Sequence, residues 1–424
     1  MFATLRNAWK IPDLRGRMTF TLLMLMIFRL GAVIPVPGVN IEYVRDIVQN
    51  AGLLSMFDMF SGGAFGNMTI FALSITPYIT ASIIMQLLTI AIPALEELSK
   101  EGEEGRKKIA QFTRYGTVIL AMIQAIGISV GLFRGALIDT SLFSISVVVL
   151  TLTAGTAFLM WLGEQITEYG IGNGISLLIF TGIVAGIPGG LYRTYVLTRQ
   201  GEIHLIALVV FAVVALLIIA GVVAIQEGQR RIPVQYAKRV VGRKMYGGQS
   251  THIPLKVNQA GVIPVIFAMS ILAFPQTIAF FVGENSRFAL FIGRWFSPMA
   301  SPGVYVYSFL TAVLIIFFTY FYTAVTFNPV EIASNMKKNG GFIPGIRPGK
   351  PTSDYLAKVL NRITLAGAVF LAFIAMMPMI ILNLTGMPVA FGGTALLIVV
   401  GVALETVKQI EAQMMMRHYQ GFLK

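Results

Sequence analysis

Long apolar runs, separated by charged loops, dominate the pattern of hydrophobic and polar positions along this chain. Each run approaches the length of about 20 residues that an α-helix needs to cross a bilayer. We expect ten membrane spans, at residues 19–34, 69–92, 115–133, 142–162, 175–191, 205–225, 261–282, 304–327, 363–384 and 387–404. The pattern therefore predicts an all-α polytopic membrane protein.

The composition supports this class and excludes several kinds of site. Hydrophobic residues make up 56% of the chain and charged residues 12%, against about 25% charged in soluble proteins. The chain contains no cysteine, which excludes disulfides, thiolate metal sites and iron–sulfur clusters. The first apolar run, from Thr19, lacks a small-residue cleavage site, so we expect an uncleaved span rather than a signal peptide.

Lysine and arginine are distributed unevenly between the two sides of the predicted membrane. Most of the 32 basic residues fall in the termini and in the loops on the side of the N-terminus. The opposite side carries only Arg45, Arg134, Arg193, Arg199, Arg287 and Arg294. Because basic residues concentrate on the cytoplasmic side of membrane proteins, both termini are predicted to be cytoplasmic.

Ten spans divide into two halves of five, at residues 1–191 and 192–424. An odd number of spans in each half places the second half upside down relative to the first. Short sequence similarities fit this plan: GISLLI at 174–179 resembles GTALLI at 393–398, and ITPYI at 75–79 resembles IPVI at 263–266. These similarities pair the fifth span with the tenth and the second with the seventh, as an inverted repeat requires.

The stretch from Ser55 to Ile92 begins with SMFDMFSGGAFGN, which is too rich in glycine to span a bilayer as a helix. Its methionines and phenylalanines also make it too apolar for a water-exposed loop. Two interpretations remain open from composition. One is a re-entrant segment enclosed by protein or by a water-filled cavity, and the other is an interfacial loop among the lipid headgroups.

Few groups capable of chemistry lie within the predicted spans. Arg29 is the exception, and we expect it to snorkel toward the interface or to pair with a neighbouring helix. No HExxH motif, phosphate-binding loop or nucleophile–base pair occurs, and the glycine-rich residues 170–174 are interpreted as a tight turn entering the fifth span. We therefore expect neither an enzyme nor a cofactor or metal site.

Isoleucines recur at helical spacing in these spans. Ile75 and Ile79 are four residues apart, as are Ile175 and Ile179, so each pair shares one helix face. Under the internal repeat Ile79 corresponds to Ile266 and Ile179 to Ile398. The isoleucines could form an apolar ring that closes a pore, or they could make ordinary contacts with lipid and neighbouring helices.

Two long basic loops lie on the predicted cytoplasmic side. Residues 226–260 carry seven basic residues against one acid, and residues 328–362 carry six against two. A docking surface for a large acidic partner such as ribosomal RNA is one interpretation, and topology or anionic lipid is the other. The candidate docking residues are Arg230, Arg231, Lys238, Arg239, Arg243, Lys244, Lys337, Lys338, Arg347 and Lys350.

Nearly the whole chain resembles the SecY family of bacterial protein-translocation channels. The segments that carry the resemblance are ITPYITASIIMQLLT, EGEEGRKKIAQFTRYGT, FLMWLGEQITEYGIGNGIS, GQRRIPVQYAKR, QSTHIPLKVNQAGVIPVIFA, FNPVEIASNMKKNGGFIPGIRPG and GGTALLIVV. The resemblance implies an hourglass channel between two five-helix halves. Such a channel passes unfolded secretory chains across the bacterial cytoplasmic membrane and releases transmembrane segments sideways into the lipid bilayer.

The resemblance also implies roles for particular residues. The family's pore ring corresponds to Ile75, Ile79, Ile175, Ile179, Ile266 and Ile398. Its plug corresponds to about residues 53–67, including Phe57, Met59, Phe60, Gly62, Gly63, Phe65 and Gly66. Its lateral gate, which binds signal peptides, lies between the second and third spans and the seventh and eighth, with Thr80, Gln124, Ser270 and Phe274 as candidates.

The partners implied by the resemblance are the small membrane subunits SecE and SecG, the motor ATPase SecA and the ribosome. Arg347 matches the family arginine needed for motor-driven transport of preproteins. Two rival functions are a solute carrier with inverted repeats and a purely structural membrane anchor for ribosomes. The absence of charge within the spans argues against ion coupling, and the broken segment at 55–67 is not explained by an anchor.

Overall fold

The computed structural model describes residues 2–50, 54, 58, 61–201, 205–236, 239–241, 244–246, 250–282, 286–296, 303–385 and 393–421. The described chain is predominantly helical. Its helices are α1 (Phe2–Trp9), α2 (Pro12–Gly31), α3 (Ile41–Asn50), α5 (Thr76–Ala91), α6 (Pro93–Lys100), α7 (Glu103–Ile126), η1 (Gly127–Leu132), η2 (Arg134–Ala136), α8 (Leu142–Tyr169), α9 (Gly174–Arg199), α10 (Leu205–Glu227), α11 (Ile263–Val282), α12 (Arg287–Trp295), α13 (Gly303–Thr326), α14 (Pro329–Lys338), α15 (Lys350–Thr385) and α16 (Gly393–Gly421).

Six helical segments among the described residues are long and apolar enough to cross a membrane. They are Glu103–Leu132, Leu142–Tyr169, Gly174–Arg199, Leu208–Glu227, Gly303–Lys338 and Lys350–Met377. Helices α5 and α6 form a seventh if they are joined, although they are bent by 99° where Pro93 begins α6. The protein is therefore a multi-pass membrane protein. The expected tenth span begins among residues outside the described part of the chain.

The second and third expected spans differ from the structure at their boundaries. Helix α5 begins at Thr76, with Pro77 in its first turn, rather than at Thr69. Residues 69–75 instead form turns, and Met68 and Ser74 adopt positive φ angles of 42° and 52°. Hydropathy alone includes these residues in the span because they are apolar, but their backbone is not helical. The third span begins at Glu103 rather than at residue 115, and it ends close to the expected boundary through one stretch of π-helix, η1.

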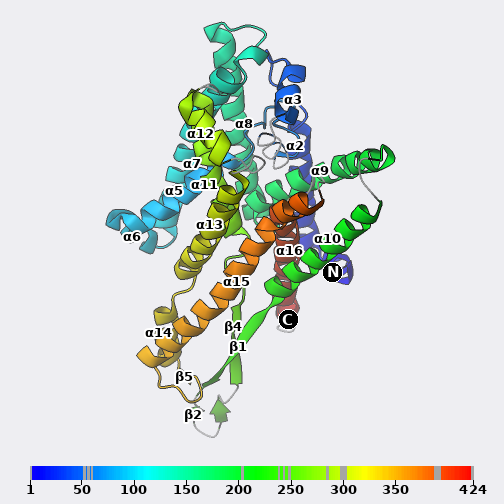
Figure 1. Ribbon diagram of the computed structural model, residues 1–424. Helices are drawn as coiled ribbons and strands as arrows, with labels where there is room; N and C mark the ends of the chain where they lie inside the picture. The colour runs from blue at the N-terminus through cyan, green and yellow to red at the C-terminus, as the bar shows by residue number, and fades with distance from the viewer. Residues whose placement is uncertain are drawn as a thin grey trace.

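The helices pack mainly within two groups along the chain. Helices α2, α5, α7, α8 and α9 contact one another in the first group, and α10, α11, α13, α15 and α16 do so in the second. The groups meet where α11 contacts α5 and η1, and where α16 contacts α9. Helix α1 also packs on α16, so the two ends of the chain lie close together (Figure 1).

A small sheet at one end of the molecule was not anticipated from the sequence. Strands β1 (Gln229–Tyr236), β4 (Ser250–Lys256) and β5 (Gly341–Phe342) form an antiparallel sheet in the order β4-β1-β5. A separate ribbon joins β2 (Arg239–Val241) to β3 (Lys244–Tyr246). Ile232 pairs with Ile253, and Ile232 and Val234 are buried against α14 and the start of α15. This end, formed by β1, β4, β5 and α14, is called the sheet end.

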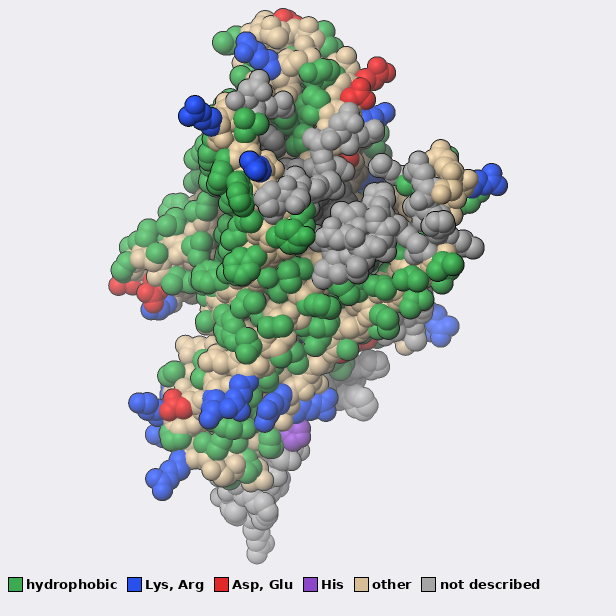
Figure 2. All heavy atoms as spheres, viewed as in Figure 1, with side chains coloured by type: hydrophobic (Ala, Val, Ile, Leu, Met, Phe, Trp, Pro, Cys, Tyr) green, Lys and Arg blue, Asp and Glu red, His purple; other side chains and the backbone are tan. Residues whose placement is uncertain are grey.

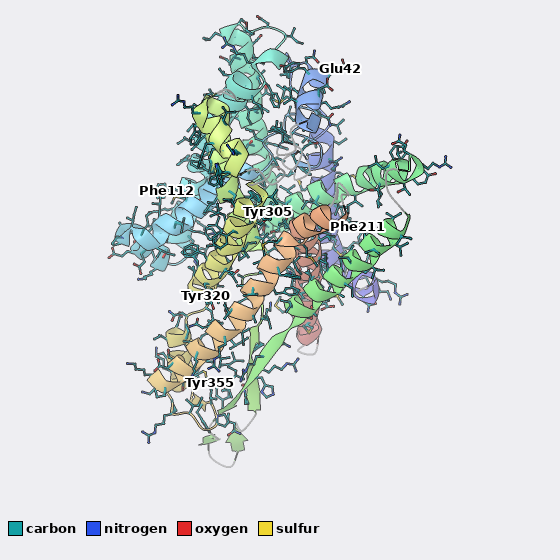
Figure 3. The ribbon with its side chains drawn as sticks, viewed as in Figure 1. Glu42, Phe112, Phe211, Tyr305, Tyr320 and Tyr355 are labelled. Carbon is teal, nitrogen blue, oxygen red and sulfur yellow. The ribbon has the colours of Figure 1, made fainter. Side chains whose placement is uncertain are left out.

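The opposite end carries shorter helices. Helix α3 contacts η2, and α12 packs on α11 and α13. Figure 3 marks Glu42 at this end, and it marks Tyr355 near the sheet end. The main hydrophobic cluster lies between the two ends and draws its residues from both groups of helices, including Ile179 and Ile398.

Candidate functional site

The structure brings all six predicted ring isoleucines into one hydrophobic cluster. Ile75, Ile79, Ile179 and Ile398 are buried, with 2%, 9%, 8% and 2% of their surface exposed, and Ile175 and Ile266 are half-buried against the same cluster. Ile75 immediately precedes α5, and the other five lie on α5, α9, α11 and α16. Since α5 contacts α11 and α9 contacts α16, the six positions lie on adjoining helices although they are spread across the sequence.

Local sequence signals position the isoleucines of α9. The predicted turn at residues 170–174 is present, with Gly172 at a φ of 89°. Asn173 caps the helix because its Oδ1 accepts from the backbone N–H of Ser176 at 3.2 Å. The hydroxyl of Thr167 also accepts from the N–H of Gly174 at 2.9 Å. Ile175 and Ile179 therefore occupy the first two turns of a firmly capped helix.

The irregular stretch before α5, residues 61–75, is enclosed by protein. None of its side chains is exposed. Two backbone hydrogen bonds join it to the chain after α2, from Val36 N–H to Met68 O at 2.9 Å and from Ile70 N–H to Ile34 O at 3.0 Å. Enclosure by protein fits the re-entrant interpretation better than a loop exposed among headgroups.

Three of the predicted plug residues, Phe57, Met59 and Phe60, lie outside the described residues. Among the others, Phe65 is buried and its ring lies 5.7 Å from that of Phe133. Its neighbour Ala64 is 1% exposed and belongs to the same cluster as the ring isoleucines.

Gly62 brings the irregular stretch into direct contact with α9. Its φ is 66°, and a Cβ at this position would lie 2.7 Å from the carbonyl oxygen of Gly182. Only glycine permits both the positive φ and this approach. Gly182 follows Ile179 by three residues, so the contact lies one helical turn beyond a ring position. Gly63 has a φ of 86° but no comparably close neighbour.

Hydrogen bonds stabilise the turn that contains these glycines. The N–H of Gly66 donates to Asp58 Oδ1 at 2.6 Å, and Asn67 Nδ2 donates to the carbonyl of Gly63 at 2.7 Å. Burial raises the pKa of the Asp58 carboxyl, which precedes the second span, although the N–H of Gly66 opposes this shift. The turn is thus internally bonded as well as enclosed.

Arg29 makes a contact that the sequence did not predict. Its Nη1 donates to the carbonyl oxygen of Gly62 at 3.2 Å, across 33 positions of the chain. The expectation was a snorkelling side chain or a partner on a neighbouring helix. The structure instead places this arginine on the backbone of the irregular stretch.

The four lateral-gate candidates lie on helices that meet between the two groups. Thr80 is on α5, Gln124 is on α7, and Ser270 and Phe274 are on α11. The hydroxyls of Thr80 and Ser270 donate within their own helices, to Thr76 O at 3.1 Å and Ile266 O at 2.9 Å. Phe274 is 47% exposed. The contacts of α11 with α5 and η1 form one of the junctions between the two groups.

Basic side chains gather at the sheet end, where Figure 2 shows a band of Lys and Arg side chains. The exposed docking candidates are Arg230, Arg231, Lys337, Lys338, Arg347 and Lys350, and we call them the basic surface. Arg239 and Lys244 fall in β2 and β3, whereas Lys238 and Arg243 lie outside the described residues. Lys337 and Lys338 occupy the last turn of α14, where the helix dipole favours positive charge.

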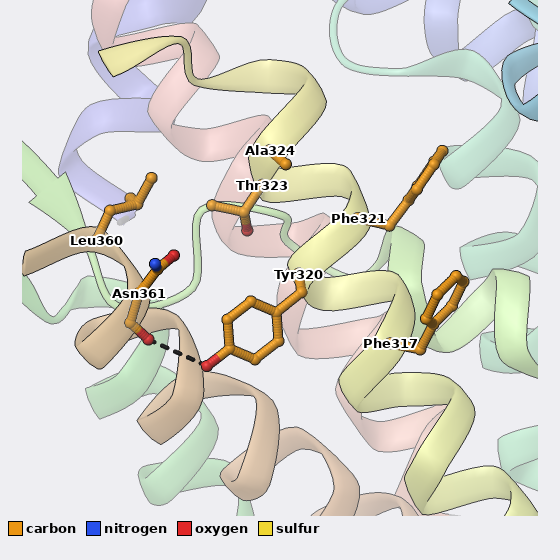
Figure 4. A pocket seen from close by; sticks show the side chains of 7 residues that line it. All are labelled: Phe317, Tyr320, Phe321, Thr323, Ala324, Leu360 and Asn361. Atoms are coloured by element: carbon orange, nitrogen blue, oxygen red, sulfur yellow. Dashed lines mark hydrogen bonds between the residues drawn. The ribbon is translucent and has the colours of Figure 1, made fainter. Parts of the chain in front are cut away.

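A cavity of about 330 Å³ between α13 and α15 was also missed by the sequence analysis (Figure 4). Its lining residues are Phe317, Tyr320, Phe321, Thr323, Ala324, Leu360 and Asn361. The Tyr320 hydroxyl donates to the carbonyl of Asn361 at 3.1 Å and joins the two helices.

Within the described part of the chain, no cluster of three His, Asp or Glu residues could hold a metal ion.

Comparisons with known proteins agree on one family. The family model described as SecY matches residues 69–407. A relative from Halalkalibacterium halodurans, described as protein translocase subunit SecY, is 52% identical over the full length of both chains.

Two solved structures share the fold. One, described as showing that the SecY plug domain stabilises the closed channel and maintains a membrane seal, aligns with a TM-score of 0.67 and 21% identity. It covers 94% of this chain and 92% of its own. The other is Sec61 in a canine ribosome–channel complex, with a TM-score of 0.63, 19% identity and the same coverage of both chains.

Proposed function

The chain belongs to the SecY family of protein translocase subunits and is a channel subunit rather than an enzyme, and we propose that polypeptides cross the membrane between its two five-helix halves, through a constriction made by the six ring isoleucines. The halves are residues 1–191 and 192–424. The bacterial cytoplasmic membrane is the proposed location, with both termini in the cytoplasm. The packing of α1 on α16 supports placing the termini on one side.

This proposal is supported mainly by the identity of the helices that contact one another between the two halves. An inverted repeat relates the second span to the seventh and the fifth to the tenth. These are α5 with α11 and α9 with α16, and each pair is in contact. Equivalent elements touch one another only near the axis that relates them. Five of the six isoleucines lie on these helices and Ile75 immediately precedes α5, so the set surrounds the proposed axis.

The chemistry of the isoleucines suits an unfolded chain as substrate. Such a chain presents varied side chains, so a pocket of fixed shape and charge would bind some sequences and block others. Aliphatic side chains offer no directional hydrogen bonds and can close around a strand without gripping it. The same apolar surface excludes water and ions when no chain is present.

The enclosed turn fits a plug next to this constriction. Ala64 shares a hydrophobic cluster with the ring isoleucines, and Gly62 contacts α9 one turn beyond Ile179. We assign residues 53–67 to the plug, with the described part in its closed position. Opening sideways into lipid would require α11 to separate from α5 and η1, past Thr80, Gln124, Ser270 and Phe274.

The basic surface is the proposed docking site for the ribosome and for the motor ATPase SecA. A structural neighbour is a Sec61 channel in complex with a ribosome, and ribosomal RNA is strongly anionic. SecE and SecG are the proposed membrane partners. The chain contains no nucleotide-binding motif, so the energy that opens the channel must come from a partner.

Site-specific cross-linking tests the route of the polypeptide. A photoreactive residue at Ile79 or Ile179 should cross-link to a secretory chain stalled in transit, because both positions border the constriction. The matched control is Leu217, an exposed residue on the outer surface of α10. Cross-links at Leu217 with none at Ile79 or Ile179 would contradict the proposed route.

A further inference from the structure

Two arginines from neighbouring helices hold the turn at residues 61–67. Arg29, in the last turn of α2, donates from Nη1 to the carbonyl of Gly62 at 3.2 Å. Arg45, on α3, donates from Nη2 to Oδ1 of Asn67 at 2.7 Å. The two contacts lie at opposite ends of the same short turn.

Arg29 is unusual because it is half-buried in an otherwise apolar part of its helix. A guanidinium has five N–H donors, and removing them from water without partners is unfavourable. Among the described residues no carboxylate lies within ion-pair distance of Arg29. The Gly62 carbonyl is thus a charge-assisted hydrogen-bond partner for this half-buried group.

The acceptor at Gly62 is a backbone oxygen. The contact therefore depends on where the backbone of the turn lies and not on any side chain of the turn. In the structure it forms with the turn against α9, where Gly62 approaches Gly182. Displacement of the turn would break the hydrogen bond and leave the guanidinium half-buried without it. The contact therefore favours the enclosed position specifically.

We propose that Arg29 is a positioning residue that latches the 61–67 turn beside the isoleucine cluster, and that Arg45 adds a weaker latch through Asn67. The Arg45 contact is weaker because it is exposed and water competes for both partners. Both latches, together with Gly182, belong to residues 1–191. This inference rests on the proposed role of residues 53–67 as the plug.

The absence of cysteine allows a direct test, since one introduced thiol is the only thiol in the chain. Ala64→Cys places it at a site that is 1% exposed. Its alkylation by a water-soluble maleimide is measured on the resting protein in nanodiscs with its partner subunits. We expect Arg29→Gln to accelerate alkylation about tenfold or more, as loss of a charge-assisted hydrogen bond implies. Arg45→Ala should accelerate it by about twofold.

Two controls separate a latch from general loosening. Ala260→Cys, at a site 2% exposed near the start of α11, should react at the same slow rate with and without the Arg29→Gln substitution. Arg29→Lys keeps a charged donor and should restore part of the protection at residue 64. An unchanged rate at residue 64 in Arg29→Gln, or equal acceleration at residues 64 and 260, would overturn the proposal.

The alkylation assay uses no transported chain, so its outcome is independent of the cross-linking test. Cross-links at Ile79 with no effect of Arg29→Gln would reject the latch and leave the channel route intact. Faster alkylation without those cross-links would show a latched turn in a protein whose polypeptide route lies elsewhere.

Discussion

A single glycine determines how closely the turn at residues 61–67 can approach α9. The backbone of Gly62 has a φ of 66° and contacts the backbone of Gly182. A side chain at position 62 would therefore strain the backbone and also collide with Gly182. Its neighbour Gly63 has a φ of 86°, but a Cβ there would make only an ordinary van der Waals contact, at 3.8 Å from Asn67 Nδ2. A comparison of substitutions at the two positions therefore distinguishes the effect of backbone strain, which both share, from the effect of close packing, which only Gly62 has.

We predict that Gly62→Ala will open the resting channel to ions more than Gly63→Ala. Both substitutions cost about 1 kcal/mol for a left-handed backbone, but only the first also places a methyl group against the carbonyl of Gly182. Ion flux through proteoliposomes that contain each variant measures the difference. Equal flux for the two variants would mean that the contact with α9 does not hold the turn.

Among the elements, the sheet end is a small structural unit with its own core. The core contains Ile232, Val234 and Leu255 from β1 and β4, and Met336 and Leu356 from α14 and α15. The strands alternate buried and exposed residues, which directs Arg231 outward while Ile232 points inward. Packing of this core therefore sets the spacing of the basic surface.

We predict that Ile232→Ala will weaken ribosome binding without removing a charge. Loss of a buried isoleucine side chain costs roughly 2–5 kcal/mol, which is enough to loosen the sheet on α14 and α15. Binding of purified ribosomes and limited proteolysis of residues 226–260 are the measurements. Arg230→Ala, at an exposed position of the same strand, should weaken binding without increasing proteolysis. The prediction is wrong if Ile232→Ala leaves both measurements unchanged.

At the scale of the whole molecule, the proposed docking site at the sheet end must be coupled to the proposed constriction. The hydrophobic cluster that contains the ring isoleucines lies between the two groups of helices, and α13 and α15 connect the sheet end to that cluster. Arg347 lies at the beginning of this path, exposed in the turn before α15. Its carbonyl accepts from the Thr352 hydroxyl at 2.8 Å, a contact that does not involve its side chain.

Replacement of Arg347 by glutamate should therefore abolish motor-driven export while leaving the fold intact. The measurements are export of a preprotein into inverted vesicles with the motor ATPase, and thermal stability of the purified complex. Lys350→Glu introduces the same change of charge three residues away and should reduce export only partially. Normal export by Arg347→Glu would remove this residue from the proposed motor contact.

Local signals determined a large part of this protein from its sequence. Hydropathy identified a multi-pass membrane protein because a bilayer imposes length and polarity on each span separately. The turn at 170–174 and the cap at Asn173 were accessible because capping depends on a few adjacent residues. The isoleucine spacing and the internal repeat left a pore ring and ordinary helix contacts both open, and the resemblance to the family supplied the roles of the ring, plug and gate residues.

Contacts between distant segments were decided only by the tertiary structure. Residues 69–75 are apolar enough to belong to a span, but backbone bonds to the chain after α2 hold them in turns. Strand β1 forms because β4 supplies hydrogen bonds along one edge and β5, which is remote in sequence, supplies them along the other. Likewise, Arg29 meets Gly62 because the fold packs the turn at residues 61–67 beside the end of α2. Sequence patterns report which surfaces are apolar, whereas the pairing of surfaces depends on how all the helices pack together.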